Sequence, residues 1–201
     1  MGPKGWHSRG YLPHLNGGTL AQMVTFRLAG TLPAELVEYW KKVVRGKGQS
    51  DDLIRYRQTV EEYLDRGEGP QWLQQSELAQ VVENALLHFD GDRYALMAWV
   101  VMPNHVHAVL SPQDEHDLTD IVFSWKSYTS NAANRALGRT GAFWEVDYFD
   151  RYIRDEKHLT NAVDYVEMNP AYAKLCKRPA EWQWSSARRR ESSERGHPAR
   201  L

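Results

Sequence analysis

This sequence of 201 residues has no long apolar run, no pair of cysteines and almost no net charge. No apolar run approaches the roughly 20 residues that a membrane span requires, and the N-terminus lacks the charged-then-apolar pattern of a secretory signal. Cys176 is the only cysteine, which excludes a disulfide framework and a cysteine-rich zinc site. We therefore expect a cytoplasmic protein that does not associate with membranes.

The formal net charge of -1 argues against a uniformly basic nucleic-acid-binding protein. The charges are unevenly spread, because residues 51–92 are rich in acidic side chains and residues 151–190 are rich in basic ones. The basic segment either forms a patch on a nearly neutral protein or contributes ordinary solvated faces. With 42% hydrophobic residues, the chain is long enough for one compact domain. We expect this domain to cover residues 1–187 and a disordered tail to cover 188–201.

The segment Trp99–Leu110 contains two apolar runs joined by a tight turn, which predicts a hairpin of two β-strands. The second run begins with His105, Val106 and His107, and alternation along a strand places both histidines on one face. Two such rings either lie on a wet sheet surface or converge on a divalent metal ion, and the otherwise apolar run favours the metal. Without a cysteine partner the site would be open, so its third ligand must come from elsewhere in the chain.

The rest of the chain alternates between strand-like and helical patterns. Strands are expected at 23–29, at 94–102, at 105–110 and within 142–153. Helices are expected within 33–45, 51–64, 71–88, 118–137, 155–168 and 171–176. This order predicts an α+β fold, most simply a ferredoxin-like split βαβ arrangement with an antiparallel sheet, helices mainly on one face and an added helical segment at about 33–90. The face left free would carry the two histidines.

Tyr165 and Asn169 are four residues apart in the last major helix, which places them on the same helix face. The amide oxygen of Asn169 is a candidate third metal ligand, and the phenol of Tyr165 is a candidate nucleophile. The other interpretation is a core tyrosine followed by an asparagine that ends the helix before Pro170. Tyr128 is the weaker candidate nucleophile, because Ala132 stands where a ligand would be needed four residues later.

An ordered series of short blocks supports the first interpretation: Met102–His107, Trp125–Thr129, Phe143–Glu145, Tyr152–Asp155, Tyr165–Pro170 and Trp182–Ser186. Together they resemble the HUH single-tyrosine transposases, and most closely the REP-associated tyrosine transposase branch. The resemblance runs in order from about residue 9 to 187. A lone His-x-His pair is weak evidence, whereas a series covering nearly the whole chain is strong. The segment at about 33–90 is longer than the compact core of the family.

The resemblance implies that His105 and His107 are the paired metal-binding histidines, that Asn169 is the third ligand and that Tyr165 is the nucleophile. It also implies an enzyme that uses Mg²⁺ or Mn²⁺ on single-stranded DNA at hairpin-forming repeats. Such an enzyme is an endonuclease and strand transferase that forms a 5′-phosphotyrosine link. A catalytically silent protein that recognises structured repeats, and a metal phosphodiesterase that uses water, are the alternatives. The protein is expected to be a monomer or a homodimer.

Further residues are candidates for DNA contact. Four basic side chains would contact phosphates or remain solvated surface charges: Lys126, Arg135, Arg151 and Arg154. The segment Gly17, Gly18 and Thr19 resembles, slightly further upstream, a Gly-Thr segment with which some members of the family read the hairpin flank. Three aromatic residues would stack on bases if they are exposed, although the tryptophans are expected in the core: Trp125, Trp144 and Tyr148.

Overall fold

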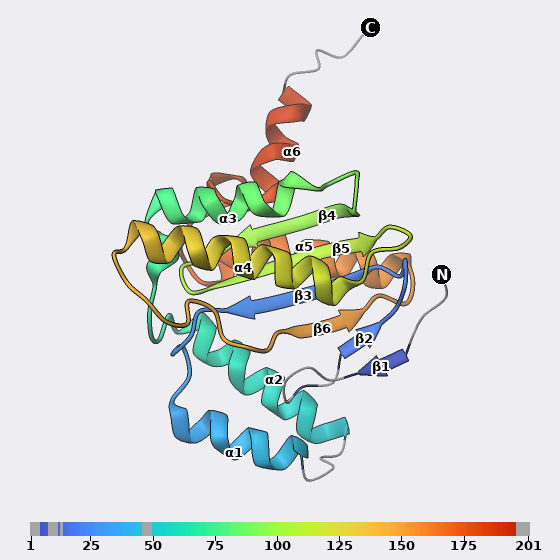
Figure 1. Ribbon diagram of the computed structural model, residues 1–201. Helices are drawn as coiled ribbons and strands as arrows, with labels where there is room; N and C mark the ends of the chain where they lie inside the picture. The colour runs from blue at the N-terminus through green and yellow to red at the C-terminus, as the bar shows by residue number, and fades with distance from the viewer. Residues whose placement is uncertain (1–4, 8–11, 13, 46–49, 196–201) are drawn as a thin grey trace, which may run out of the picture.

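The protein is described by a computed structural model that covers residues 5–7, 12, 14–45 and 50–195. A four-stranded antiparallel sheet in the order β4-β5-β3-β6 lies at its centre (Figure 1). The first of these strands is β3 (Gln22–Arg27), β4 (Tyr94–Val101) and β5 (His105–Pro112) form the predicted hairpin, and β6 (Phe149–Tyr152) pairs with β3 at one edge. This strand order is that of a ferredoxin-like split βαβ sheet, which confirms the predicted fold class.

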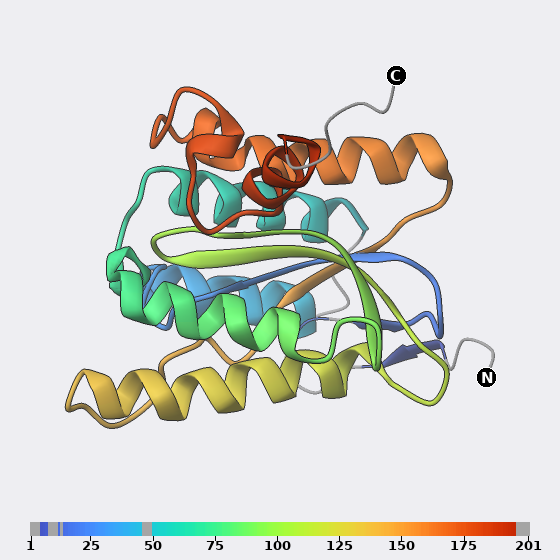
Figure 2. The same cartoon turned by 90° about the horizontal axis from the view of Figure 1, so that it is seen from above.

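Helices lie on both faces of the sheet. One face is covered by α3 (Ser76–His88) and α4 (Leu118–Ala136), and α5 (Glu156–Tyr172) covers the other (Figure 2). On the α5 side lies also α2 (Ser50–Asp65), against which α1 (Ala34–Arg45) packs. The prediction that the histidine-bearing face is free is therefore wrong. Both faces of the central strands are apolar, and so both must be covered.

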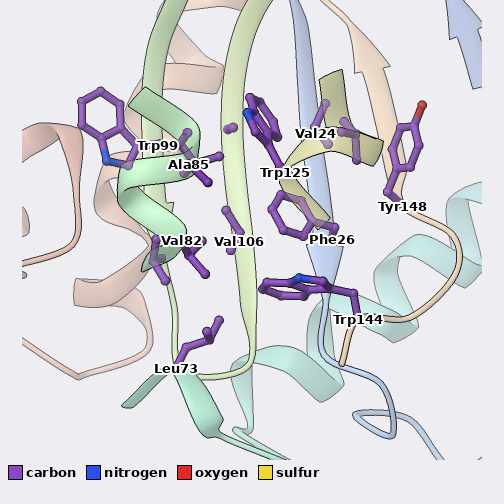
Figure 3. Close-up of a cluster of buried hydrophobic side chains, with 14 of the residues drawn as sticks. Val24, Phe26, Leu73, Val82, Ala85, Trp99, Val106, Trp125, Trp144 and Tyr148 are labelled. Atoms are coloured by element: carbon purple, nitrogen blue, oxygen red, sulfur yellow. The ribbon is translucent and has the colours of Figure 1, made fainter. Parts of the chain in front are cut away.

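Alternation along the strands divides the core into two layers. Phe26 and Val106 point towards α4, where they pack with Trp125 in the cluster shown in Figure 3. The residues that alternate with these point to the opposite face of the sheet. There Val109 of β5 packs in one cluster with Val166 of α5. The side chains at odd positions of β5, including His105 and His107, therefore face α5.

The added helical segment has a hydrophobic cluster of its own. The ring of Trp40 of α1 contacts that of Tyr56 of α2 with centroids 5.1 Å apart, and the ring of Tyr56 contacts that of Phe149 of β6 at 5.4 Å. Val60 and Leu64 of α2 are buried in the same cluster. These contacts attach α2 to the β6 edge of the sheet, next to the face that carries the histidines.

The N-terminal part forms a small sheet of its own, in which β1 (Gly5–His7) pairs antiparallel with β2 (His14–Asn16). Short 3₁₀ turns, η1 (Trp72–Gln74) and η2 (Pro179–Glu181), precede α3 and α6. Among the helices of the described residues, none has the length and apolar character needed to cross a bilayer.

The C-terminal part differs from prediction in two ways. Helix α5 continues past Asn169 to Tyr172, because a proline in the last turn removes only one hydrogen bond and does not end the helix at once; the predicted short helix at 171–176 does not form separately. The predicted tail from residue 188 is wrong as far as residue 195, since α6 (Ser186–Arg195) occupies it. Ion pairs hold this helix, such as that between Arg190 and Glu167 at 3.2 Å. Residues 196–201 lie outside the described residues.

A buried histidine joins β2 to the region of β6. His14 Nδ1 lies 2.6 Å from Asp150 Oδ1, and its Nε2 lies 3.9 Å from Asp147 Oδ1. Asp150 also accepts a hydrogen bond from the backbone N–H of Leu15. Burial alone would lower the pKa of His14, but the hydrogen bonds and charges of the two aspartates outweigh it, and the pKa is raised above its ordinary value.

This raised pKa makes the stability that His14 provides dependent on pH. The contribution is fully present below the unfolded-state pKa of about 6.5 and is lost as the pH rises through the higher folded-state value. The unfolding free energy that His14→Gln removes is therefore expected to be larger at about pH 6 than at about pH 8.5. Urea unfolding of both proteins at the two pH values measures this difference. An equal loss at both values would contradict the charged pair.

Candidate active site

His105 and His107 lie side by side at the beginning of β5, on the face covered by α5. Each is 1% exposed, and their Nε2 atoms lie 3.0 Å apart. Val106 between them points into the opposite core. Two buried imidazole nitrogens that face one another at this distance form an arrangement suited to joint binding of one metal ion.

The second nitrogen of each ring is held by a polar neighbour. His105 Nδ1 lies 2.7 Å from Asn104 Oδ1, and His107 Nδ1 lies 2.7 Å from Thr25 Oγ1 on the paired strand β3. The amide nitrogen of Asn104 donates to two backbone carbonyls at and beyond the end of α2. Its Oδ1 is therefore the acceptor for the Nδ1 proton of His105, which leaves Nε2 of His105 with a lone pair for a metal.

Both histidines are neutral at neutral pH. Burial lowers the pKa of His105 to about 3, which outweighs the opposite effect of the neighbouring Asn169 amide. Burial also lowers the pKa of His107 well below its ordinary value, and His105 and the cationic Arg57 lower it further. Neutral imidazole is the form that binds metal ions.

Asn169 supplies an oxygen to the same place. Its side chain is 3% exposed, and its Oδ1 is buried without a hydrogen-bond partner among the described residues. Leaving a buried acceptor unpaired costs about 1–3 kcal/mol, so the oxygen is set for a ligand that the protein itself does not provide. The described residues contain no group of three or more His, Cys, Asp and Glu side chains that could hold a metal. A metal ion held by the two histidines would therefore need a third protein ligand of another kind, such as the Asn169 amide.

Because the Asn169 oxygen has no partner in the described part of the chain, removing it should affect metal binding but not folding. We expect Asn169→Ala to leave the unfolding free energy of the metal-free protein within about 1 kcal/mol of wild type, because the change also removes an unpaired acceptor. We expect it to weaken metal binding by at least about tenfold, and with it the rise in Tm on adding Mn²⁺. Thermal unfolding with EDTA and with Mn²⁺ measures both effects.

Asn131→Ala, at an exposed position of α4, is the matched control and should behave as wild type. Full retention of the Mn²⁺ effect by Asn169→Ala would contradict a role for this amide as ligand. A loss of several kcal/mol of stability in EDTA would instead make the residue structural.

Tyr165 lies one helical turn before Asn169 on α5 and is half-buried. Its ring contacts that of His107, with centroids 5.5 Å apart and planes at 69°. The structure thus brings together all four residues of the predicted centre, from two neighbouring positions on a strand and one face of a helix.

A pocket of about 330 Å³ adjoins Tyr165. It lies between β3, β6, α2 and α5, and its polar lining consists of Arg57, Glu61, Arg151, His158, Asn161 and Tyr165. Of the predicted phosphate contacts, Arg151 lies in this pocket. Arg154 is next to it, since its backbone N–H donates to His158 Nδ1 at 3.3 Å. Partial burial, with repulsion from Arg57 and Arg154, lowers the pKa of Arg151.

The other two predicted phosphate contacts lie away from this centre. Lys126 and Arg135 belong to α4, which covers the opposite face of the sheet (Figure 2). Lys126 Nζ donates to the carbonyl of Val146 at 2.6 Å. Burial lowers the pKa of Lys126 to about 8, although nearby acidic side chains oppose this shift. Arg135 is exposed.

Gly17, Gly18 and Thr19 lie in the turn between β2 and β3. Gly18 has a φ of 61°, which a glycine adopts without strain. The turn is attached to the sheet by Ser111 Oγ, which donates to the carbonyl of Thr19 at 2.5 Å. The turn leads into the end of β3 that pairs with Tyr152. The histidines pair with residues towards the other end of β3, so the turn lies away from them.

The aromatic candidates for base stacking are core residues. Trp125, Trp144 and Tyr148 are only 2%, 4% and 6% exposed, so none presents a ring face to DNA. Tyr128 is 62% exposed on α4, on the far side of the sheet from the histidines. Its position removes it from the candidate centre.

Several residues around the centre are not predicted from the sequence. Asn104 and Thr25 orient the histidines, and Arg57 and His158 line the pocket beside Tyr165. Asn104 directly precedes the histidine motif, which is a usable signal. Arg57 lies in the acidic segment of the sequence, and nothing in its neighbourhood indicates a site.

Comparisons with known proteins relate this chain to transposases. Residues 71–169 match the family model described as "Transposase IS200 like". The chain is 26% identical over 112 residues to the REP-associated tyrosine transposase of Escherichia coli K12, covering 55% of this chain and 65% of that protein. A Haemophilus influenzae protein named for the same family is 24% identical over 106 residues, covering 48% and 60%. The chain thus spans about two thirds or less of the length of the curated relatives that it matches.

The fold is also that of a solved structure. A REP-associated tyrosine transposase bound to a REP hairpin superposes with a TM-score of 0.58 at 19% identity, over 96% of this chain and 87% of that one. At this level of identity the likeness concerns the fold. It extends over almost the whole chain, beyond the segment matched by the family model.

Proposed function

Because residues 71–169 match the model of the IS200-like transposase family, we propose that this chain cuts and rejoins single-stranded DNA at hairpin-forming repeats. The observation that carries the proposal is the convergence of His105, His107, Asn169 and Tyr165. Two neutral buried imidazoles, an unpaired buried amide oxygen and a phenol meet at one place. A relative with the same fold binds a REP hairpin, which supports this class of substrate.

The three ligand residues fit a divalent metal ion of the Mg²⁺ or Mn²⁺ type. Nitrogen from His105 and His107 and oxygen from Asn169 leave further positions for substrate oxygens, as an open catalytic site requires. When bound, the ion supplies positive charge that stabilises the phosphodiester as its leaving oxygen becomes negative. Asn104 and Thr25 fix the orientation of the rings.

Tyr165 then provides the attacking oxygen. A phenol with an ordinary pKa near 10 must lose its proton to attack. The phenol oxygen bonds to phosphorus, the bond from phosphorus to the 3′ oxygen breaks, and that oxygen takes up a proton. The products are a 5′-phosphotyrosine link and a free 3′-hydroxyl. Attack of a 3′-hydroxyl on the link reverses the step and joins strands, which a water nucleophile would not permit.

Product analysis tests the proposal. Single-stranded oligonucleotides that cover hairpin repeats beside the gene, labelled at either end, are incubated with the protein and Mn²⁺ or Mg²⁺. We expect metal-dependent cleavage in which the upstream fragment has a free 3′-hydroxyl and the downstream fragment is attached to protein. Two free fragments would identify a phosphodiesterase that uses water. Binding without cleavage of any oligonucleotide would identify a silent DNA-binding protein.

A further inference from the structure

We propose that the pocket beside Tyr165 is a second phosphate site, in which Arg57, Arg151 and His158 bind the phosphodiester next to the one that is cut. This inference rests on the proposed function, because it assumes that a DNA strand passes Tyr165. The ligand is one internucleotide phosphate, on either the 5′ or the 3′ side of the scissile bond. Arg57 is supplied by α2, so the site gives the added helical segment a role in holding DNA.

The position of the pocket separates it from the metal centre. On α5 its lining residues His158, Asn161 and Ala162 precede Tyr165, whereas the metal ligand Asn169 follows it. A strand whose scissile phosphate lies at the histidines therefore extends past Tyr165 into the pocket. A volume of about 330 Å³ accommodates a phosphate together with part of its sugar.

The charge of the pocket favours an anion. Arg57 and Arg151 line the pocket together. Burial lowers the pKa of Arg151, and the nearby cations Arg57 and Arg154 lower it further. Burial also lowers the pKa of His158, and Arg151, Arg154 and Arg57 add to this effect. The opposing carboxylates are Glu61 on α2 and Asp155, which caps α5. A phosphodiester in the pocket would relieve the repulsion among the cations.

The carboxylate of Glu61 would compete with a phosphate for Arg57. Arg57 Nε donates to Glu61 Oε1 at 2.9 Å, and both side chains are 27% exposed. A phosphate that enters must share or displace this carboxylate. Removing the carboxylate should therefore strengthen DNA binding, whereas removing Arg57 should weaken it. A purely structural ion pair predicts no gain of affinity on removing Glu61.

The test measures binding without cleavage, in the Tyr165→Phe background. Affinity for the single-stranded repeat oligonucleotides is measured over a range of salt concentrations. Arg57→Gln should weaken binding about fivefold to tenfold at about 0.1 M salt and lower the slope of log affinity against log salt by about 0.7. Glu61→Gln should tighten binding about twofold to fivefold. Arg55→Gln, an exposed arginine of the same helix outside the pocket, is the matched control and should change neither quantity.

Neutral methylphosphonate linkages identify the phosphate. One linkage at a time is replaced on either side of the cleavage position. We expect replacement at one of the adjacent positions to weaken binding by the parent, but to have no further effect on binding by Arg57→Gln. The side on which this occurs distinguishes a 5′ from a 3′ neighbour.

The proposed phosphate site is contradicted if Arg57→Gln and Arg55→Gln bind DNA alike. It is also contradicted if every methylphosphonate weakens DNA binding equally in the parent and in Arg57→Gln. Failure of the parent to bind any of these oligonucleotides would overturn it as well. The proposed function is judged separately, by the covalent link in the protein that retains Tyr165. If Arg57→Gln weakens binding but no covalent link forms, the protein binds DNA without cutting it. If the link forms but Arg57→Gln binds normally, the protein is a transposase that holds its DNA strand elsewhere.

Discussion

Replacing Tyr165 by phenylalanine is expected to lower DNA cleavage by about 10³-fold or more and to abolish the covalent link to DNA. The variant lacks only the phenol oxygen, and its ring can retain the contact with His107 at 5.5 Å between centroids. Folding and binding of the strand should therefore persist. Cleavage of end-labelled oligonucleotides, compared with binding measured by anisotropy, gives the two quantities independently.

Tyr128→Phe is the control for this prediction, because Tyr128 is exposed and lies on α4 at the opposite face of the sheet. It should cleave at the rate of wild type. Cleavage that survives in Tyr165→Phe with unchanged metal dependence would show that water is the nucleophile. Loss of cleavage in both variants would mean that the site extends to the face of the sheet on which Tyr128 lies.

Substituting His107 is expected to have the second large effect. Removing one of the two nitrogens that we propose as metal ligands should weaken metal binding by at least about 100-fold and reduce cleavage by about 10³-fold at low Mn²⁺. Much higher Mn²⁺ should restore part of the activity. Since His107 is 1% exposed, His107→Gln is preferable to alanine, which would leave a larger cavity.

Cleavage rates over a titration of Mn²⁺ measure this effect, with thermal unfolding in EDTA as the check on folding. His88→Gln, at an exposed position of α3, should leave the metal titration unchanged. The same metal dependence in His107→Gln and wild type would remove the histidine pair from the metal site. A variant that fails to fold in EDTA is replaced by Asn169→Ala, whose orphan oxygen is expected to be dispensable for folding.

The centre of the site follows from local rules of sequence. The period of two in a strand places His105 and His107 on one face, and the helical period places Tyr165 and Asn169 on another. That these two faces meet depends on α5 covering the sheet. The sequence predicts a free sheet face instead, because hydrophobic alternation in one strand does not say which helix packs upon it.

The pocket beside Tyr165 could not be predicted from the sequence, for a related reason. Arg57 comes from a segment that is acidic overall, and its place beside Tyr165 depends on long-range packing of Tyr56 against Phe149 of β6. Proline was also misleading, since Pro170 suggests the end of a helix that in fact continues to Tyr172. Contacts between elements distant in sequence decide both points, and no local pattern records them.

The charge distribution likewise has a structural meaning that its sequence does not reveal. The basic candidates divide between the two faces of the sheet: Arg151 and Arg154 accompany Tyr165, whereas Lys126 and Arg135 lie on α4. A strand bound at the histidines therefore meets the first pair. The second pair would be reached only by DNA that also passes over the other face.

The most direct test of the central claim is to identify the residue that becomes attached to DNA. Wild-type protein is incubated with the repeat oligonucleotides and Mn²⁺, denatured and digested with protease and nuclease, and the nucleotide-bearing peptide is sequenced by mass spectrometry. We expect a single modified residue, Tyr165, linked to a 5′-phosphate and seen only when metal is present. Modification of another tyrosine, or efficient metal-dependent cleavage without any modified peptide, would contradict it.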